Sequence, residues 1–382
     1  MWWWVSLKKI RVVVADSNHD YLKSFVSFTR TSHNDSRFVF TYFSDQQILQ
    51  EYIDHGHAID LLLISPDLHE SVMNLADDVL IVLLEDDILS DDDRTFPGVY
   101  RYQRLSQLLS NLIGLYYEHN EAAERQLVRS KQAKVISVYS PVGGTGKTTV
   151  AANLSKQLAL NGSKVFYLNL ETINSSGLFF SSEEDNPSLQ IFYYAKSDFK
   201  QLLSKIETLK KHDAYAMVDY FDIEINAEEM LEMRGEEVKR IINGIVKTGE
   251  YNYIIVDLDS SLHERNRTAL TESDNILWIM TNDNQSILKT KALLDKEEDL
   301  FGKKNIIRDR MTTILNKFTG AQIGDMDDLG VTIDGYLPFI SAWLVPQTND
   351  GILGNDRFNQ EIQTIARNII VYNKEGVATG GL

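Results

Sequence analysis

The chain of 382 residues is long enough for two domains, and its 43% hydrophobic and 24% charged residues are typical of a globular protein. A net charge of −17 disfavours broad binding to nucleic acid, because so acidic a surface repels a polyphosphate backbone. The absence of cysteine excludes disulfides and thiolate metal sites and fits a reducing cytoplasm. No apolar run reaches the roughly 18–20 residues that a membrane span needs.

The first 117 residues alternate short apolar runs with segments of helical spacing. The runs expected to form strands are 11–15, 38–43, 59–64, 79–84 and 98–102, and helical spacing occurs at 21–29 and 103–117. Strands that alternate with helices over about a hundred residues are typical of a parallel sheet covered on both faces. We therefore predict one α/β domain over residues 1–117.

A polar stretch separates this region from the rest of the chain. Residues 118–133 have no clear apolar face, so we predict a linker there. Beyond it the expected strands are 135–139, 165–170, 216–219, 254–257, 276–280 and 313–316, and the expected helices include 148–160 and 227–247. The prediction is an α/β chain of two doubly wound parallel-sheet domains, the second over residues 134–373, with a flexible tail at 374–382.

A glycine-rich segment at 140–149, SPVGGTGKTT, joins an expected buried strand to an amphipathic helix. Glycines let backbone N–H groups approach phosphate oxygens, and a helix N-terminus adds partial positive charge. In such a loop Lys147 would reach the β- and γ-phosphates, and the Thr148 hydroxyl would ligate Mg²⁺. The pattern predicts ATP binding; the alternative is a strand-to-helix turn without a ligand. The residues assigned to ATP here are Gly143, Gly144, Thr145, Gly146, Lys147, Thr148 and Thr149.

Residues 142–148 resemble the deviant Walker A loop of the ParA/MinD superfamily, which reads Lys-Gly-Gly-x-Gly-Lys-Ser/Thr. The match includes Gly143 and Gly144, and Pro141 stands where a classical loop has its first glycine. Val142 replaces the family's signature lysine, which reaches across a dimer interface to the partner's nucleotide. The resemblance implies a P-loop NTPase fold, ATP and Mg²⁺ as cofactors, a homodimer, and nucleotide binding with weakened hydrolysis.

A second motif supplies a carboxylate for the metal. The segment Tyr253–Asp257 reads YIIVD, an apolar strand that ends in an aspartate about a hundred residues after the phosphate loop. Asp257 is placed to hold Mg²⁺ through water, so Thr148 and Asp257 are the expected metal-binding residues. Asp259 is interpreted as a loop residue.

The strand expected at 165–170 runs into an acidic residue. The family has Asp-x-Asp here, and its second aspartate orients the attacking water; the matching residues are Asn169 and Glu171. The resemblance therefore makes Lys147 and Glu171 the catalytic residues. In-line attack is sensitive to displacements of about 1 Å, so the longer glutamate side chain predicts slow turnover. The alternative is that Glu171 is a solvated loop acid.

Two later segments resemble the parts of the family that contact the base. The segment 313–318, TILNKF, resembles a strand whose terminal asparagine hydrogen-bonds the adenine edge, here Asn316. The segment 335–339, GYLPF, resembles the family's Gly-x-hydrophobic-Pro segment, which assigns Pro338 and Phe339 to the base.

The first region resembles response-regulator receiver domains in the runs RVVVADSN and IDLLLISP. A working receiver has an acidic pair after its first strand, an aspartate phosphoacceptor at the end of its third, a Thr or Ser at the end of its fourth and a lysine at the end of its fifth. Its carboxylates hold Mg²⁺ for phosphoryl transfer. Here Asp16 alone remains of the acidic pair, the phosphoacceptor position falls at Ser65, and the later positions fall at Glu85 and Gln103. The resemblance implies a receiver fold retained for protein contacts; the alternative is a generic α/β domain.

The order of the two regions resembles the TadZ/CpaE group, which positions the tight-adherence (Flp-type) pilus assembly machinery. This resemblance implies an ATP-switched homodimer that recruits pilus assembly or secretion components, in the cytoplasm, at a cell pole or peripheral to the membrane through partners. The alternatives are a DNA-partitioning ATPase, a MinD- or flagellar-type positioning ATPase, a capsule-type tyrosine kinase and a non-hydrolysing scaffold.

Two features near the C-terminus have structural interpretations. An apolar stripe at helical spacing predicts a final helix that faces the core; it consists of Phe358, Ile362, Ile365 and Ile369. A small basic cluster is interpreted as a solvated helix end; it consists of Lys303, Lys304, Arg308 and Arg310.

Overall fold

The computed structural model describes residues 9–31, 37–69, 75, 78–86, 96–120, 133–182, 188–197, 199–303, 305–320, 330–345 and 347–379. The chain forms two compact units, one of residues 1–130 with 203–208 and one of residues 131–202 with 209–382. Most of the predicted linker, residues 121–132, lies outside the described residues.

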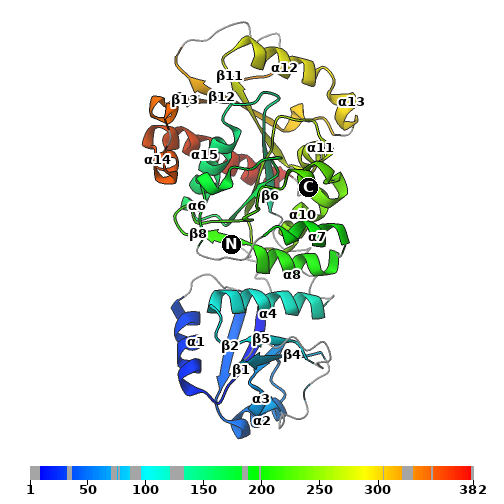
Figure 1. The fold of residues 1–382 in the computed structure, drawn as a ribbon, viewed down its shortest axis with the longest axis vertical. Helices are drawn as coiled ribbons and strands as arrows, with labels where there is room; N and C mark the ends of the chain where they lie inside the picture. Colours follow the sequence, from blue (N-terminus) through cyan, green and yellow to red (C-terminus); the bar gives the residue numbers. More distant parts are fainter. Residues whose placement is uncertain are drawn as a thin grey trace. The chain divides into compact units, whose positions relative to one another are not determined.

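The first unit is a five-stranded parallel sheet with helices on both faces (Figure 1). Its elements are β1 (Ile10–Ala15), α1 (His19–Thr31), β2 (Phe38–Phe43), α2 (Gln46–Asp54), β3 (Leu61–Ile64), α3 (Pro66–His69), β4 (Leu80–Glu85), β5 (Gly98–Tyr100) and α4 (Leu105–His119). The strand order β2-β1-β3-β4-β5 is the flavodoxin-like order of doubly wound sheets.

Alternation along β1 explains why both faces of this sheet are covered. Val12 and Val14 pack into an apolar cluster with residues of α1 and α4. Val13 and Ala15 pack into a second cluster with residues of α2 and α3. Successive side chains of a strand point to opposite faces, so a continuous apolar run such as VVVA is stable only between two layers of helices.

The second unit is built on an eight-stranded sheet. The elements from β6 to β10 are β6 (Lys134–Tyr139), α6 (Lys147–Leu160), β7 (Val165–Asn169), η1 (Ser176–Leu178), α7 (Gln190–Ser197), α8 (Phe199–Leu209), β8 (Lys211–Asp213), β9 (Val218–Tyr220), α9 (Ala227–Glu232), α10 (Gly235–Lys247) and β10 (Tyr253–Asp257). Residues 203–208 of α8 group with the first unit. The later elements are α11 (Glu264–Glu272), β11 (Asn275–Thr281), α12 (Asn284–Leu294), α13 (Glu297–Phe301), η2 (Arg308–Arg310), β12 (Met311–Phe318), β13 (Gly335–Pro338), η4 (Ser341–Leu344), α14 (Asn349–Leu353) and α15 (Asp356–Thr379).

The strand order in this sheet is β13-β12-β11-β6-β10-β7-β9-β8, and all pairs are parallel except β8 with β9. The two doubly wound α/β units predicted from the sequence are thus confirmed, with the antiparallel β8 as an addition. From β6 the chain builds outward through β7 on one side and later through β11, β12 and β13 on the other. The carboxyl end of β6 therefore lies where the winding reverses, the usual ligand position in such sheets.

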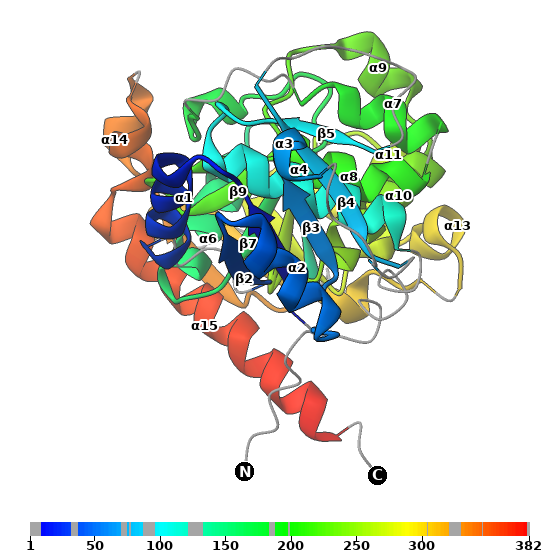
Figure 2. The ribbon, with the colours of Figure 1, turned by 90° about the horizontal axis from the view of Figure 1, so that it is seen from below.

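The final helix α15 packs alongside α6 on one face of the second sheet (Figures 1 and 2). Its stripe of Phe358, Ile362, Ile365 and Ile369 is buried, which confirms the predicted core-facing helix. The helix continues to Thr379, so it extends into the segment 374–382 that was predicted to be a flexible tail. None of the described helices is both long enough and apolar enough to cross a bilayer.

Candidate nucleotide-binding site

The phosphate-loop segment connects β6, the central strand, to the N-terminus of α6. Gly144 and Gly146 have φ angles of 73° and 91°, in the left-handed region that favours glycine. A Cβ added at Gly143 or Gly144 would meet no atom within 4 Å, so the loop is open at both positions. Gly146 caps α6 without any side-chain hydrogen bond. The first N–H groups of the helix are thus uncapped by protein side chains and are suited to bind an anion.

Lys147 begins α6, and its side chain is buried near three acidic groups. Its Nζ donates a 2.9 Å hydrogen bond to Ser260 Oγ. Burial lowers the pKa of Lys147, whereas the charges of Asp257 and Glu171 oppose that shift. The ammonium is therefore held at the loop by a neutral hydroxyl that a phosphate oxygen could replace.

Asp257 ends β10 and is fully buried. Its Oδ2 accepts a 2.8 Å hydrogen bond from the Tyr167 hydroxyl, and its Oδ1 is buried without a hydrogen-bond partner among the described residues. Burial and the charge of the nearby Glu171 raise the pKa of Asp257, and the nearby hydroxyls of Tyr167 and Thr148 oppose that rise. A buried carboxylate oxygen without a partner is costly, and it fits a hydrated cation at this position.

The donor set fits Mg²⁺ bound together with a nucleotide. The hydroxyl of Thr148 and the carboxylate of Asp257 are both oxygen ligands. In the described part of the chain no group of three or more His, Cys, Asp or Glu side chains could hold a metal ion. Mg²⁺ would thus take most of its ligands from phosphate and water, as it does in phosphoryl-transfer sites.

Glu171 follows β7 and is directed toward the loop. Its backbone N–H donates to Asn169 Oδ1 at 2.8 Å, and Asn169 Nδ2 lies 3.4 Å from Glu171 Oε2. Burial raises the pKa of Glu171, while Asn169, Lys147 and the Thr148 hydroxyl lower it. The structure thus places this carboxylate beside the Lys147 ammonium and the Thr148 hydroxyl, and its role toward water stays a prediction.

Asn316 and Lys317 fasten the end of β12 to the phosphate loop. Asn316 Nδ2 donates to the carbonyl of Thr145 at 2.7 Å, and Lys317 Nζ donates to the carbonyl of Gly144 at 2.7 Å. Lys317 adopts a left-handed φ of 55°, which is uncommon for a residue with a Cβ. Sequence reasoning missed the Lys317 contact, because it depends on this backbone conformation.

The other residues predicted to bind ATP lie around the same loop. Thr149 is in the first turn of α6, where its carbonyl accepts a hydrogen bond from Asn153. Pro338 ends β13 opposite Phe318, and Phe339 follows it with a partly exposed ring. The contacts of Asn316, Pro338 and Phe339 with a base stay predictions.

Asp259 is more than a loop residue. Its carboxylate is bonded to Thr172, Arg265 and Asn266, and Arg265 is fully buried. Sequence reasoning missed this network, because nothing in the pattern ERNRTAL marks its first arginine as buried.

The strand ends of the first unit carry a different polar cluster. Arg101 follows β5, and its guanidinium lies 3.4 Å from Asp16 and 3.0 Å from Asp86. Ser65 follows β3 and is fully buried. The sequence comparison with receivers assigned Gln103 to the position at the end of the fifth strand, but β5 ends at Tyr100 and a buried arginine occupies this place.

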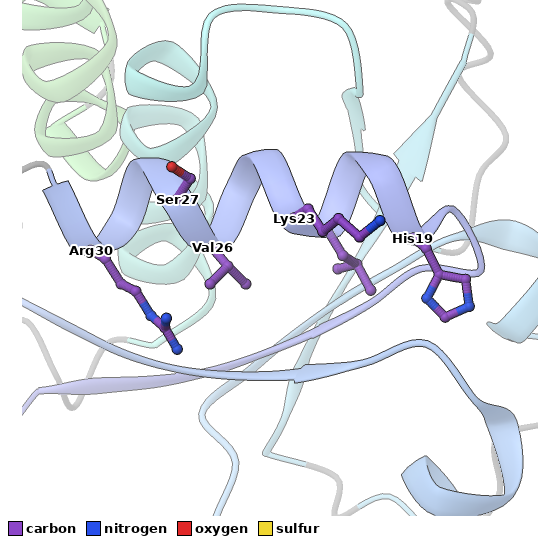
Figure 3. Close-up of a pocket in the computed structure, with 6 residues that line it drawn as sticks. His19, Lys23, Val26, Ser27 and Arg30 are labelled. Carbon is purple, nitrogen blue, oxygen red and sulfur yellow. The ribbon is translucent and has the colours of Figure 1, made fainter.

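A groove of about 490 Å³ runs along α1 in the first unit (Figure 3). His19, Lys23, Val26 and Arg30 project to one side of this helix. Leu22 and Ser27 complete the lining. None of the residues predicted to bind ATP lines this groove.

Comparisons with known proteins agree with this geometry. A family model described as an AAA domain matches residues 133–306. The chain is 24% identical over 204 residues to an uncharacterized ATP-binding protein of Methanocaldococcus jannaschii, which covers 53% of this chain and 71% of that relative. It is 25% identical over 248 residues to the septum site-determining protein MinD of Thermotoga maritima, which covers 62% of this chain and 87% of MinD.

A solved structure shares the fold of the second unit. The ParA family ATPase from Chlorobium tepidum TLS superposes with a TM-score of 0.52 and 21% identity over 62% of this chain and 98% of that protein. The sheet, the phosphate loop and these matches define a P-loop ATPase domain. In its fold, this domain resembles the ParA/MinD type of ATPase.

Proposed function

We propose that the chain is an ATP- and Mg²⁺-binding, dimerising switch that hydrolyses ATP slowly and localises a tight-adherence pilus assembly or secretion complex. The observation that carries the proposal is the convergence of Lys147, Thr148 and Asp257 on an open glycine loop at the carboxyl end of β6. Uncapped amides, one ammonium and an orphaned carboxylate oxygen together match a triphosphate with its metal ion.

The surface around the loop supports a face-to-face homodimer. Large apolar side chains are exposed in segments that follow the carboxyl ends of β7, β9, β10, β11 and β13. They are Ile173, Leu178, Ile225, Leu262, Leu288, Phe339 and Leu344. Carboxyl ends of parallel strands share one edge of a sheet, so these segments lie toward the same edge of the sheet as the phosphate loop. Clustered exposed apolar side chains mark interaction sites, and a second copy would cover them.

Slow turnover follows from two departures from the family pattern. Val142 is 7% exposed and carries no charge, so it supplies no cation to a partner's nucleotide. Glu171 holds a carboxylate in place, but one methylene farther along the side chain than aspartate. We expect nucleotide binding not to depend on either residue, because the loop amides and Lys147 would contact the phosphates.

The pilus role is supported by the order of the two units. A flavodoxin-like unit with a buried arginine among its polar strand ends precedes the ATPase, and its α1 groove offers a surface for a partner. A positioning or partitioning ATPase is the second candidate, favoured by the matches to MinD and to the chromosome partitioning protein ParA of Myxococcus xanthus.

DNA binding by the basic cluster near η2 is disfavoured. Arg310 donates to carbonyls at the end of α11, and Arg308 lies 3.4 Å from Glu297. Lys304 lies outside the described residues. Two of the four cations are therefore used within the protein, and the chain carries a net charge of −17.

Calorimetric titration of the full chain with ATP and Mg²⁺, combined with sedimentation velocity, tests the proposal. We expect saturable binding and nucleotide-dependent dimerisation in the wild type, and neither in Lys147→Ala with an unchanged circular dichroism spectrum. An unchanged dimer in that variant would overturn the switch.

A deletion experiment tests the cellular role. Deletion of the gene from a piliated host should abolish pili, and only the wild-type gene should restore them.

A further inference from the structure

Arg265 lies in the first turn of α11 and is 0% exposed. Its Nε donates to the carbonyl of Leu170 at 2.8 Å, and one terminal nitrogen donates to the carbonyl of Met230 at 2.6 Å. Its other terminal nitrogen lies 2.5 Å from both Thr172 Oγ1 and Asp259 Oδ2. One buried guanidinium therefore connects the segment after β7, the segment after β10 and α9.

The carboxylate of Asp259 is held on both oxygens. Oδ2 also accepts from the Thr172 hydroxyl at 2.8 Å, while Oδ1 accepts from Asn266 Nδ2 at 2.6 Å and from the backbone N–H of Ser261 at 2.9 Å. Burial acts to raise the pKa of Asp259, but the bonds from Ser261 and Thr172 and the charge of Arg265 hold it well below its ordinary value. The segment after β10 is thereby fixed by an ionised group.

This network surrounds two groups of the nucleotide site. Glu171 lies between Leu170 and Thr172, and Arg265 bonds both of these neighbours. Ser260, which accepts the hydrogen bond from Lys147, lies between Asp259 and Ser261. A shift of Arg265 would thus move the Glu171 carboxylate and the hydroxyl partner of Lys147 together.

We propose that Arg265 is a positioning residue that sets the rate of ATP hydrolysis by fixing the positions of Glu171 and Ser260 relative to Lys147. The inference rests on the proposed ATPase function. In that reaction a water oxygen bonds to the γ-phosphorus, the bond to the bridging oxygen breaks, ADP leaves and the proton of the water passes to solvent. Arg265 contacts none of the reacting atoms and acts through the backbone on either side of Glu171.

The test uses a matched pair at Thr172 in the full chain. Thr172→Val keeps the shape and removes a hydroxyl that bonds both Arg265 and Asp259, whereas Thr172→Ser keeps the hydroxyl. We expect Thr172→Val and Arg265→Lys to lower kcat about ten- to hundredfold with little change in KM, because small misplacements of catalytic groups have effects of this size. Thr172→Ser should restore most of the activity.

Arg310→Met is the control for general loss of stability. Arg310 is also a partly buried arginine that donates to α11 carbonyls, Leu270 and Thr271, but at the opposite end of the helix. We expect it to lower the unfolding midpoint and leave kcat unchanged. The inference is overturned if Thr172→Val lowers kcat no more than Arg310→Met, if the loss falls on KM alone, or if the wild type binds ATP without turnover. A wild type that binds no ATP would instead refute the proposed function.

Discussion

The hydroxyl of Tyr167 donates a 2.8 Å hydrogen bond to the carboxylate of Asp257, and both side chains are buried in the second sheet. The two residues lie on adjacent parallel strands, β7 and β10. Tyr167 thus orients the carboxylate that we expect to bind the metal, and leaves the other oxygen of Asp257 free for it.

Tyr167→Phe should weaken Mg²⁺-dependent ATP binding about tenfold, because groups that orient metal ligands have effects of this size. Without nucleotide, the loss of the bond should lower the free energy of unfolding by about 1–3 kcal/mol. Tyr251→Phe is the matched control, since it removes a bond of the same 2.8 Å length to Asp219. Calorimetric titrations with and without Mg²⁺ measure the effect, and equal affinities for all three proteins would contradict this role.

Two glycines of the phosphate loop should respond differently to alanine. At Gly146 a Cβ would lie 2.4 Å from Asn316 Nδ2 and φ is 91°, so Gly146→Ala should destabilise the fold as well as abolish binding. At Gly143 a Cβ would meet no atom within 4 Å. Gly143→Ala should therefore keep the urea midpoint of the wild type and weaken ATP binding, because the methyl group would take up space needed by phosphate oxygens. Normal ATP affinity in Gly143→Ala would place the phosphates elsewhere.

Arg101 neutralises a buried carboxylate in the first unit. Burial raises the pKa of Asp16, and the backbone N–H of Asn18 and the charge of Arg101 oppose that rise, so Arg101→Met leaves a buried acid without its cation. Removing one partner of a buried pair costs about 3–5 kcal/mol of unfolding free energy. Adding Asp16→Asn should recover much of that loss. Hydrogen–deuterium exchange of the β1 and β5 amides measures the stability of the first unit. Unchanged amide protection in Arg101→Met would contradict the prediction.

A histidine at the edge of the second sheet predicts a pH dependence. His212 Nδ1 lies 2.6 Å from Asp219 Oδ1, and this hydrogen bond raises the pKa of His212 although burial opposes it. Because the folded-state pKa lies above the unfolded value, the contribution to stability is complete below that unfolded value and is lost as pH rises through the raised pKa. The urea midpoint should thus fall between about pH 6 and pH 9 by more in the wild type than in His212→Gln. Parallel curves for the two proteins would exclude this coupling.

Strands and the phosphate loop could be predicted from the sequence where the local residue pattern reflects the burial found in the structure. Apolar runs such as IDLLLI and YIIVD are buried on both faces of a parallel sheet, and the glycine loop between a strand and a helix needs particular residue types. The antiparallel β8 was not predicted, because its Lys-His-Asp sequence has neither an apolar run nor alternation.

Contacts between distant segments could not be predicted. Arg265, Asp259 and Lys317 are ordinary polar residues in the sequence, and their roles depend on which strands become neighbours. The assignment of Gln103 in place of Arg101 failed because the end of β5 lies two residues earlier than the sequence pattern indicated. Strand ends are set by pairing with β4, which local propensity does not encode.

The central position of β6 determines how late in translation the phosphate loop can acquire its contacts. β6 pairs with β10 and β11, and the loop that follows it is fastened by Ser260, Asn316 and Lys317. A ribosome must therefore synthesise well over a hundred further residues before the loop meets its neighbours. Pairings of such long sequence separation form slowly. We therefore expect a nascent or truncated chain that ends before β12 not to bind ATP, because Asn316 and Lys317 would be missing from the phosphate loop.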